Sequence, residues 1–247
     1  MENKTILVTG GGGCFGSYIA KTLAKDIGKV IAVDMNEEML GILKKEYSEI
    51  LTYCCNLSDY KQVEETVDRI IEENEKIDVL VNNAGMIFSA PLINILSKTD
   101  RKHNIEMWHK TMDANLNSLF YTSVCVVDKM IAKRIKGLII NISSISAYGN
   151  AGQSAYSAAK AAVNALTNTW SKELGMFNIR CAGIAPGFID TESTRKAMSE
   201  AVIQKWEKSI PSKRLGKVEE VSDAVKFIIN NEYFNGRIIE LDGGLKI

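Results

Sequence analysis

The sequence NISSISAYGNAGQSAYSAAK, residues 141–160, joins an apolar run to an alanine-rich segment. The apolar residues of 138–142 predict a strand, Gly149 and Gly152 predict a loop, and the alanines from position 155 onward predict a helix. A strand, a loop and a helix in this order are the repeating unit of an α/β domain. This stretch therefore indicates an α/β fold.

Tyr156 and Lys160 stand four residues apart on the predicted helix, so their side chains share one face. An ammonium group this close favours ionisation of the phenol, whose reference pKa is about 10, and suits it to proton transfer near neutral pH. A hydroxyl at the end of the strand, from Ser144 or Ser143, is placed to hydrogen-bond a substrate oxygen. The pair alone is weak evidence, because a surface lysine beside a half-buried tyrosine gives the same pattern.

Four further motifs accompany this pair along the chain. They are T9-G-G-G-G-C-F-G16, N82-N-A-G85, Asn115 and P186-G-F-I-D-T191. With these motifs the sequence resembles the short-chain dehydrogenase/reductase family along essentially its whole length. The resemblance implies an oxidoreductase that transfers hydride between a nicotinamide cofactor and a secondary alcohol or ketone.

Composition limits the other possibilities. At 247 residues and 46% apolar content, residues 1–247 are expected to form a single domain. Thirty basic and thirty acidic residues cancel, which argues against nucleic-acid or membrane partners. Five cysteines without metal-ligand spacing, and His103 and His109 on different helix faces, argue against a metal site. Met1 to Thr9 has no signal-peptide pattern and no apolar run approaches a membrane span, so the protein is expected to be cytoplasmic.

Apolar runs alternate with amphipathic segments along the chain, as expected for parallel strands covered on both faces. Strands are predicted at 5–8, 29–34, 50–54, 77–81, 138–142, 179–185 and 237–241, and helices near 18–24, 37–47, 59–73, 106–133, 155–174 and 218–229. Seven strands alternating with helices predict a Rossmann-like, doubly wound parallel sheet.

The glycine loop fits two registers of the family. Glycines between a strand and a helix let backbone N–H groups approach a pyrophosphate at the helix N-terminus. The classical branch has the pattern T-G-x-x-x-G-x-G, which requires glycine where this chain has Cys14. A pattern through Gly10, Gly13 and Gly16 resembles the extended branch, which includes nucleotide-sugar epimerases and dehydratases. The N82-N-A-G85 motif and the short chain favour the classical branch.

Asp34 ends the second predicted strand, eighteen residues beyond Gly16. A carboxylate there accepts hydrogen bonds from a ribose 2′-OH and repels a 2′-phosphate, so NAD(H) is favoured over NADP(H). Neither Gly13 nor Met35 supplies the basic side chain that a 2′-phosphate requires. The alternative role, capping the next helix, suits Asn36 better.

The resemblance also implies roles for individual residues. Tyr156 is the implied acid/base, and Ser144 steadies the substrate oxygen. Lys160 lowers the pKa of Tyr156 and holds the cofactor ribose. Asn115 distorts its helix and holds a water that links Lys160 to solvent. Ser143 remains an alternative to Ser144, because Ser144 precedes Tyr156 by twelve residues where the family more often has thirteen. Cofactor contacts are expected from Gly10, Gly13, Cys14, Phe15, Gly16, Asp34, Met35, Asn56, Leu57, Asn83, Ala84, Gly85, Tyr156, Lys160, Pro186, Gly187, Ile189 and Thr191.

The substrate and the assembly are less closely defined. Residues 192–216, with Met198, Trp206 and Pro211, resemble the family's substrate lid. Substrate contacts are expected from Met86, Phe88, Ala147, Tyr148, Phe188 and Trp206, which suit a hydroxyacyl group, a steroid-like ring or a sugar acid. Small alanines on the Tyr156 helix predict close packing with another subunit and, with the family resemblance, a homotetramer or homodimer. A sugar-nucleotide epimerase or dehydratase and a non-catalytic NAD-binding module are the alternative functions.

Overall fold

The computed structural model describes residues 4–197 and 199–245, and the predicted Met198 of the lid and residues 1–3 of the amino-terminal stretch lie outside them. The strands are β1 (Lys4–Thr9), β2 (Gly28–Asp34), β3 (Leu51–Cys54), β4 (Val79–Asn82), β5 (Leu138–Ile142), β6 (Arg180–Pro186) and β7 (Ile238–Leu241). They form one sheet in the order β3-β2-β1-β4-β5-β6-β7, and every neighbouring pair is parallel. The predicted doubly wound parallel sheet is confirmed.

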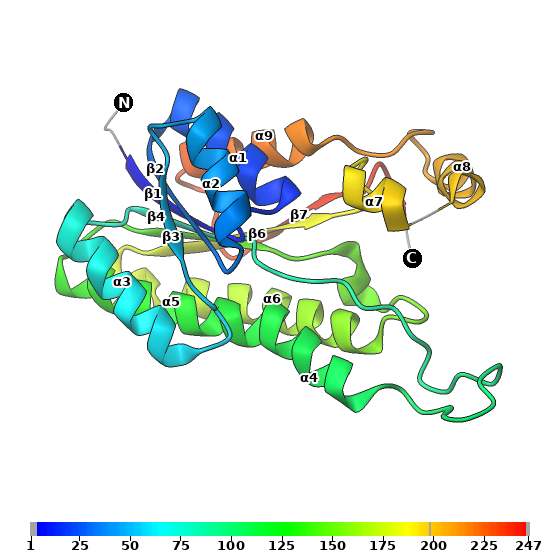
Figure 1. The fold of residues 1–247 in the computed structure, drawn as a ribbon. Helices are drawn as coiled ribbons and strands as arrows, with labels where there is room; N and C mark the ends of the chain where they lie inside the picture. The colour runs from blue at the N-terminus through cyan, green and yellow to red at the C-terminus, as the bar shows by residue number, and fades with distance from the viewer. Residues whose placement is uncertain (1–3, 198, 246–247) are drawn as a thin grey trace.

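Helices cover both faces of the sheet (Figure 1). They are α1 (Cys14–Asp26), α2 (Glu37–Glu46), α3 (Tyr60–Asn74), α4 (Ile105–Met112), α5 (Ser118–Ala132), α6 (Ser154–Glu173), α7 (Glu192–Ala197), α8 (Glu200–Ser209) and α9 (Val218–Asn230). One face carries α1, α2 and α9, and the other carries α3, α5 and α6. None of the helices in the described part of the chain has the length and apolar composition needed to span a bilayer.

An apolar core lies on each face of the sheet, because side chains alternate between the two faces along each strand. In β1, Ile6 and Val8 pack under α1 against Ile19, whereas Leu7 faces the opposite side and packs against Ile70 of α3. Each of these aliphatic side chains is essentially fully buried, which stabilises the fold by roughly 1.5–3 kcal/mol per side chain. Burial on both faces explains why the strands are continuous apolar runs.

Side chains at the ends of the elements account for small shifts in the predicted bounds. Asn36 caps α2 by accepting the Met39 N–H, so the capping role considered for Asp34 belongs to Asn36. β4 begins at Val79 rather than at residue 77, because Asp78 makes its own bonds to β1: its N–H donates to the Thr5 carbonyl and its carboxylate accepts the Thr5 N–H at 2.8 Å.

The helix predicted for residues 106–133 is interrupted by a single π-helical turn, Asp113–Asn117, which separates α4 from α5. The predicted distortion at Asn115 is therefore confirmed. The turn lies beside the C-terminal end of β4. β1 and β4 are neighbours in the sheet, but the segments that follow them run to opposite faces of the sheet. Such a switch point leaves a crevice for a ligand at the carboxyl ends of the strands.

Candidate active site

Thr9 ties together the two loops that leave the switch point. Its hydroxyl oxygen accepts the backbone N–H groups of Asn83 at 3.0 Å and of Ala84 at 3.1 Å. The Asn83 amide donates in return to the Thr9 carbonyl at 3.0 Å. The glycine loop after β1 and the N82-N-A-G85 loop after β4 are thus one rigid unit. We did not predict this role of Thr9, which was visible only as the first residue of the glycine motif.

Two of the glycines that packing requires in this loop are shared by both registers. Gly10 has a φ of +64°, and a Cβ there would lie 2.8 Å from the Ala84 Cα. A Cβ on Gly16 would lie 2.0 Å from the Gly10 carbonyl oxygen. The registers differ at positions 13 and 14. A Cβ on Gly13 would meet only the Gly10 oxygen, at 3.3 Å. Cys14 is the first residue of α1, and its side chain is exposed. The packing of the loop is therefore compatible with either register.

Asp34 holds the edge of the glycine loop. Its carboxylate accepts the N–H of Gly12 at 3.0 Å and the N–H of Asn36 at 2.9 Å. The adjacent Met35 side chain is 70% exposed and lies beside the same edge. The predicted ribose-binding carboxylate is thus fixed by two backbone donors at the carboxyl end of β2.

The remaining nucleotide-side residues serve the local structure as well. The Asn56 side-chain oxygen, at an expected cofactor contact, accepts the Ser58 N–H at 3.1 Å. Leu57 is buried among the residues beneath α3, so only its backbone is placed to contact a nucleotide.

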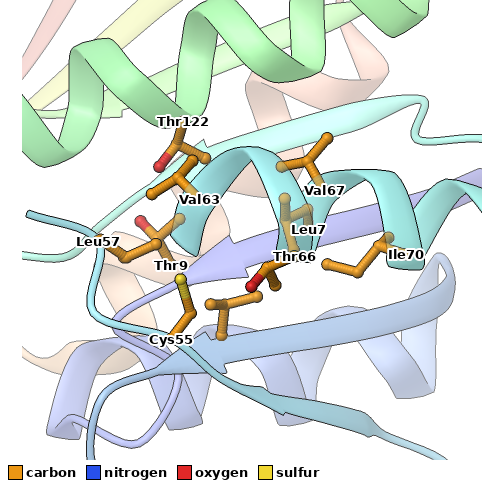
Figure 2. Close-up of a pocket in the computed structure, with 10 residues that line it drawn as sticks. Leu7, Thr9, Cys55, Leu57, Val63, Thr66, Val67, Ile70 and Thr122 are labelled. Carbon is orange, nitrogen blue, oxygen red and sulfur yellow. The ribbon is translucent and has the colours of Figure 1, made fainter. Parts of the chain in front are cut away.

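A small hollow lies under this region, between β1, β2, α3 and α5 (Figure 2). Thr9, Cys55, Thr66 and Thr122 line it together with aliphatic side chains, and its volume is about 10 Å³. This volume corresponds to a single water molecule. The hollow is therefore part of the packing beneath the crevice and is too small for a cofactor or substrate.

Tyr156 projects from the first turns of α6 and is only 9% exposed. Burial raises the pKa of its phenol above the ordinary value, and a hydrogen bond with the Ser144 side chain acts in the opposite direction. Ser144 Oγ also accepts the N–H of Ser146 at 3.1 Å. The hydroxyl of Ser143 instead donates to the Lys160 carbonyl at 3.3 Å. Of the two candidate serines, the structure thus brings Ser144 to the phenol.

Lys160 is the most unusual ionisable group of the site. It is 4% exposed, and burial lowers its pKa to about 8. Its Nζ donates to the Ile142 carbonyl at 2.8 Å and lies 5.6 Å from the centroid of the Tyr156 ring. The Lys160 ammonium is turned to the carbonyl at the end of β5, and burial is the largest influence on the Tyr156 pKa, so the effect of Lys160 on that pKa stays a prediction.

Asn115 faces the same point from the π-helical turn. Its amide nitrogen donates to the carbonyls of Met86 and Thr111, both at 2.8 Å. Its Oδ1 is buried and has no partner among the described residues. A Cβ on Gly85 would lie 2.5 Å from this oxygen and 3.7 Å from the Lys160 ammonium, so only glycine fits between them. An unpaired buried acceptor beside a lysine is a suitable place for an ordered water.

Comparison with known proteins agrees with this geometry. A family model described as short chain dehydrogenase matches residues 4–202. The chain belongs to the short-chain dehydrogenase/reductase family. It is accordingly an oxidoreductase that binds a nicotinamide cofactor and acts on small carbonyl substrates, and the family match together with its relatives places it in the classical branch.

Individual members of the short-chain dehydrogenase/reductase family match it over nearly their full length. The 3-oxoacyl-[acyl-carrier-protein] reductase FabG of Thermotoga maritima is 37% identical, covering 100% of this chain and 99% of that protein. Sorbitol-6-phosphate 2-dehydrogenase of Klebsiella pneumoniae is 31% identical, covering 99% and 96%. The crystal structure of a Bacillus anthracis short chain dehydrogenase has a TM-score of 0.85 at 30% identity, covering 98% and 95%. That of gox2181 has a TM-score of 0.90 at 26% identity, covering 99% and 96%.

The segment that closes the far side of the crevice begins at the end of β6. A Cβ on Gly187, next to Pro186, would lie 2.9 Å from the Asp242 Cα, so this position needs glycine. The Thr191 hydroxyl, at an expected cofactor contact, here accepts the Thr194 N–H at 3.0 Å. The Thr194 hydroxyl donates to the Ile189 carbonyl at 2.8 Å. A cofactor contact by Thr191 would therefore use the same hydroxyl oxygen that accepts the Thr194 N–H in the first turn of α7.

The predicted lid consists of α7 and α8. Phe188 and Trp206 stack with their ring centroids 4.2 Å apart, and they pack on a small apolar cluster that includes Ile145, next to Ser144. Tyr148, also expected to touch the substrate, instead donates its hydroxyl to Glu240 on β7. Phe188 and Trp206 are thus the aromatic residues that join the lid to the serine loop.

A buried amide network under the site was not predicted. Asn82 donates to the Asn141 side-chain oxygen and to Ser123 Oγ, both at 2.9 Å, and Asn141 donates to Thr167 Oγ1 at 2.9 Å. The network links β4 and β5 to the helices α5 and α6. The feature of the sequence that could have indicated this network is Asn141, a polar residue within an otherwise apolar strand.

Proposed function

We propose that the protein is an NAD(H)-dependent reductase of 3-oxoacyl thioesters, working by a Ser-Tyr-Lys-Asn site. The observation that carries the proposal is the buried Tyr156 phenol, which lies beside Ser144 and has the Lys160 Nζ 5.6 Å from its ring centroid; its burial raises its pKa. A phenol that stays protonated at neutral pH is suited to giving a proton to a carbonyl oxygen. The substrate class is supported by the full-length similarity to a 3-oxoacyl-[acyl-carrier-protein] reductase and by the apolar lid.

In this proposal the substrate carbonyl oxygen lies against the hydroxyls of Tyr156 and Ser144. The nicotinamide cofactor, when bound, supplies the hydride that reduces the carbonyl carbon. Tyr156 gives its phenolic proton to the oxygen, so the ketone becomes a secondary alcohol, and the reverse steps oxidise the alcohol. Ser144 steadies the oxygen as its charge develops.

Lys160 and Asn115 are proposed to return the proton to Tyr156. Lys160 has a pKa of about 8, so it exchanges protons readily near neutral pH. In this proposal the Lys160 ammonium also hydrogen-bonds the cofactor ribose when the cofactor is bound. The unpaired Asn115 Oδ1 is suited to holding a water next to this ammonium. That water would connect Lys160 to solvent.

The function is tested by mixing the purified protein with NADH and a panel of ketones while NADH consumption is followed. The expected result is turnover of acetoacetyl-coenzyme A with a higher kcat/KM than fructose 6-phosphate, the ketone that corresponds to the Klebsiella relative. Preference for the sugar phosphate would contradict the acyl substrate. Binding of NADH, seen by its fluorescence, without turnover of any ketone would favour the NAD-binding module, and epimerisation of sugar nucleotides would favour the epimerase.

The cofactor preference follows from Asp34, whose carboxylate is fixed beside the glycine loop. We expect kcat/KM for NADH to exceed that for NADPH at least about tenfold, which corresponds to about 1.4 kcal/mol. Asp34→Ala should narrow the difference, because the repulsion of a 2′-phosphate is removed. Equal kcat/KM values for the two cofactors in the unmutated protein would contradict the assignment.

We also propose that the protein assembles as a homotetramer or homodimer through α5 and α6. Phe120 and Val124 of α5 are each 45% exposed, and the Phe120 ring packs on Trp170 of α6 with a centroid distance of 6.2 Å. Apolar side chains gathered on two neighbouring helices favour contact with another subunit. Sedimentation at micromolar concentration should show a mass two or four times the 27.3 kDa of one chain. A single species with the mass of one chain would refute the proposed assembly.

A further inference from the structure

Gln153, three residues before Tyr156, forms side-chain hydrogen bonds with three residues around the serine loop. Its side-chain oxygen accepts the Ser146 hydroxyl at 2.9 Å and the Asn150 amide at 3.1 Å. Its side-chain nitrogen donates to the Ser89 hydroxyl at 3.2 Å. Both ends of this amide are therefore paired, although the residue stands at the start of α6 and makes no side-chain cap to that helix.

These bonds lead to the catalytic hydroxyls through one intermediate residue. Ser146, held by Gln153, uses its backbone N–H to donate to Ser144 Oγ at 3.1 Å. Ser144 in turn lies close enough to the phenol of Tyr156 to lower its pKa. The short 3₁₀ turn Ile145–Tyr148 carries Ser146, and such a turn has few backbone bonds of its own to fix its orientation. Gln153 adds a side-chain bond at Ser146, beside the one that Tyr148 of the same turn makes to Glu240.

The other end of Gln153 reaches the loop that follows β4. Ser89 is bonded to the Gln153 nitrogen, and the neighbouring Ala90 N–H donates to the Gly152 carbonyl at 2.7 Å. The backbone bond fixes this loop to the start of α6 independently of the side chain. The two ends of the amide therefore have separable effects: the oxygen acts on Ser146, and the nitrogen acts on Ser89.

We infer that Gln153 is a positioning residue, whose side-chain oxygen orients Ser144 toward Tyr156 by holding Ser146. This inference rests on the proposed function of Ser144 and Tyr156. Gln153 itself touches neither the cofactor nor the reacting carbonyl in this assignment. Its removal should weaken proton transfer while leaving the nucleotide crevice unchanged.

The test compares Gln153→Ala with Gln153→Glu, which keeps an acceptor for Ser146, and with Ser89→Ala, which removes only the partner of the nitrogen. We expect Gln153→Ala to lower kcat for ketone reduction about tenfold, within the range for an impaired general acid. The dissociation constant for NADH should change less than about twofold, and the glutamate variant should recover kcat to within about threefold of the unmutated protein. Ser89→Ala should keep kcat within about twofold.

The pH profile gives a readout that a general loss of stability would not move. The bond from Ser144 lowers the pKa of Tyr156, so disordering Ser144 should shift the alkaline limb of the reduction profile to higher pH. Gln153→Ala should show this shift, and Ser89→Ala should not. A kcat within twofold of the unmutated value in Gln153→Ala, or equal impairment of the alanine and glutamate variants, would overturn the inference.

A spectroscopic measurement separates this inference from the proposed function. The ¹³Cζ resonance of Tyr156, assigned with Tyr156→Phe, should move in Gln153→Ala and stay in place in Ser89→Ala, whether or not any ketone is turned over. An unmoved resonance would overturn the positioning role. If Gln153→Ala fails to fold, Ser146→Ala removes the same bond from its other end and is expected to shift the same resonance.

Discussion

Replacing Tyr156 by phenylalanine is expected to lower kcat for ketone reduction about a thousandfold, the loss typical of a general acid that also orients the substrate. The phenol is the proton donor of the proposed reaction, and its burial keeps it protonated at neutral pH. The phenyl ring keeps the apolar contacts of the tyrosine, so NADH affinity should stay within about threefold. Steady-state kinetics with acetoacetyl-coenzyme A and fluorescence titration with NADH measure the two quantities.

Ser144→Ala is the companion to this variant, because it removes the hydrogen bond to the phenol without removing the proton donor. Its kcat should fall less than that of Tyr156→Phe. A phenylalanine variant that retained more than a few per cent of kcat would show that another group donates the proton. Loss of NADH binding in that variant would point to a damaged fold instead, which circular dichroism would reveal.

Lys160→Met is expected to remove activity and weaken NADH binding while making the free protein more stable by about 2 kcal/mol at neutral pH. Burial lowers the pKa of Lys160 from 10.5 to about 8, and at about 1.4 kcal/mol per unit the buried ammonium costs about 3 kcal/mol below pH 8. Losing its bond to the Ile142 carbonyl costs about 1 kcal/mol. Methionine has nearly the length of lysine without the charge, so the net effect is stabilising.

The pH dependence of this stabilisation identifies its cause. Between pH 8 and 10.5 the unfolded chain binds a proton at Lys160 that the folded chain has released, so the free energy of unfolding of the unmutated protein rises with pH in this window. The advantage of Lys160→Met should therefore be complete below pH 8 and shrink toward pH 10.5. Urea unfolding at several pH values measures it. Lys172→Met on the exposed side of α6 is the control and should show no such trend.

Much of the fold could be predicted because its strands are buried on both faces. Residues such as Ile6, Leu7 and Val8 have to be apolar wherever a parallel strand is covered by helices, so their pattern marks the strand directly. The capping of α2 by Asn36 was likewise a local property of the sequence. The start of β4 was misplaced because Asp78 pairs with β1, a partner distant in sequence.

The candidate site could be predicted less completely. Spacing correctly placed Tyr156 and Lys160 on one helix face, but it could not show that the Lys160 ammonium turns to the Ile142 carbonyl or that burial controls the Tyr156 pKa. Both properties depend on how deeply α6 packs against the sheet. Thr9 and Gln153 were missed for a related reason: their partners come from other loops, and nothing local in the sequence marks those bonds.

The π-helical turn Asp113–Asn117 makes the length of the α4–α5 helix as important as its composition. A π turn holds one residue more than an α turn, so it rotates everything that follows by about 100° relative to an uninterrupted helix. Asn115 is buried within this turn, whereas Phe120 and Val124 are exposed on the helix that follows it. Deleting Ala114 removes only one methyl side chain, but it would rotate the side chains of α5 about the helix axis relative to those of α4. In an insertion and deletion scan this helix should tolerate exchanges of surface residues and reject changes of length.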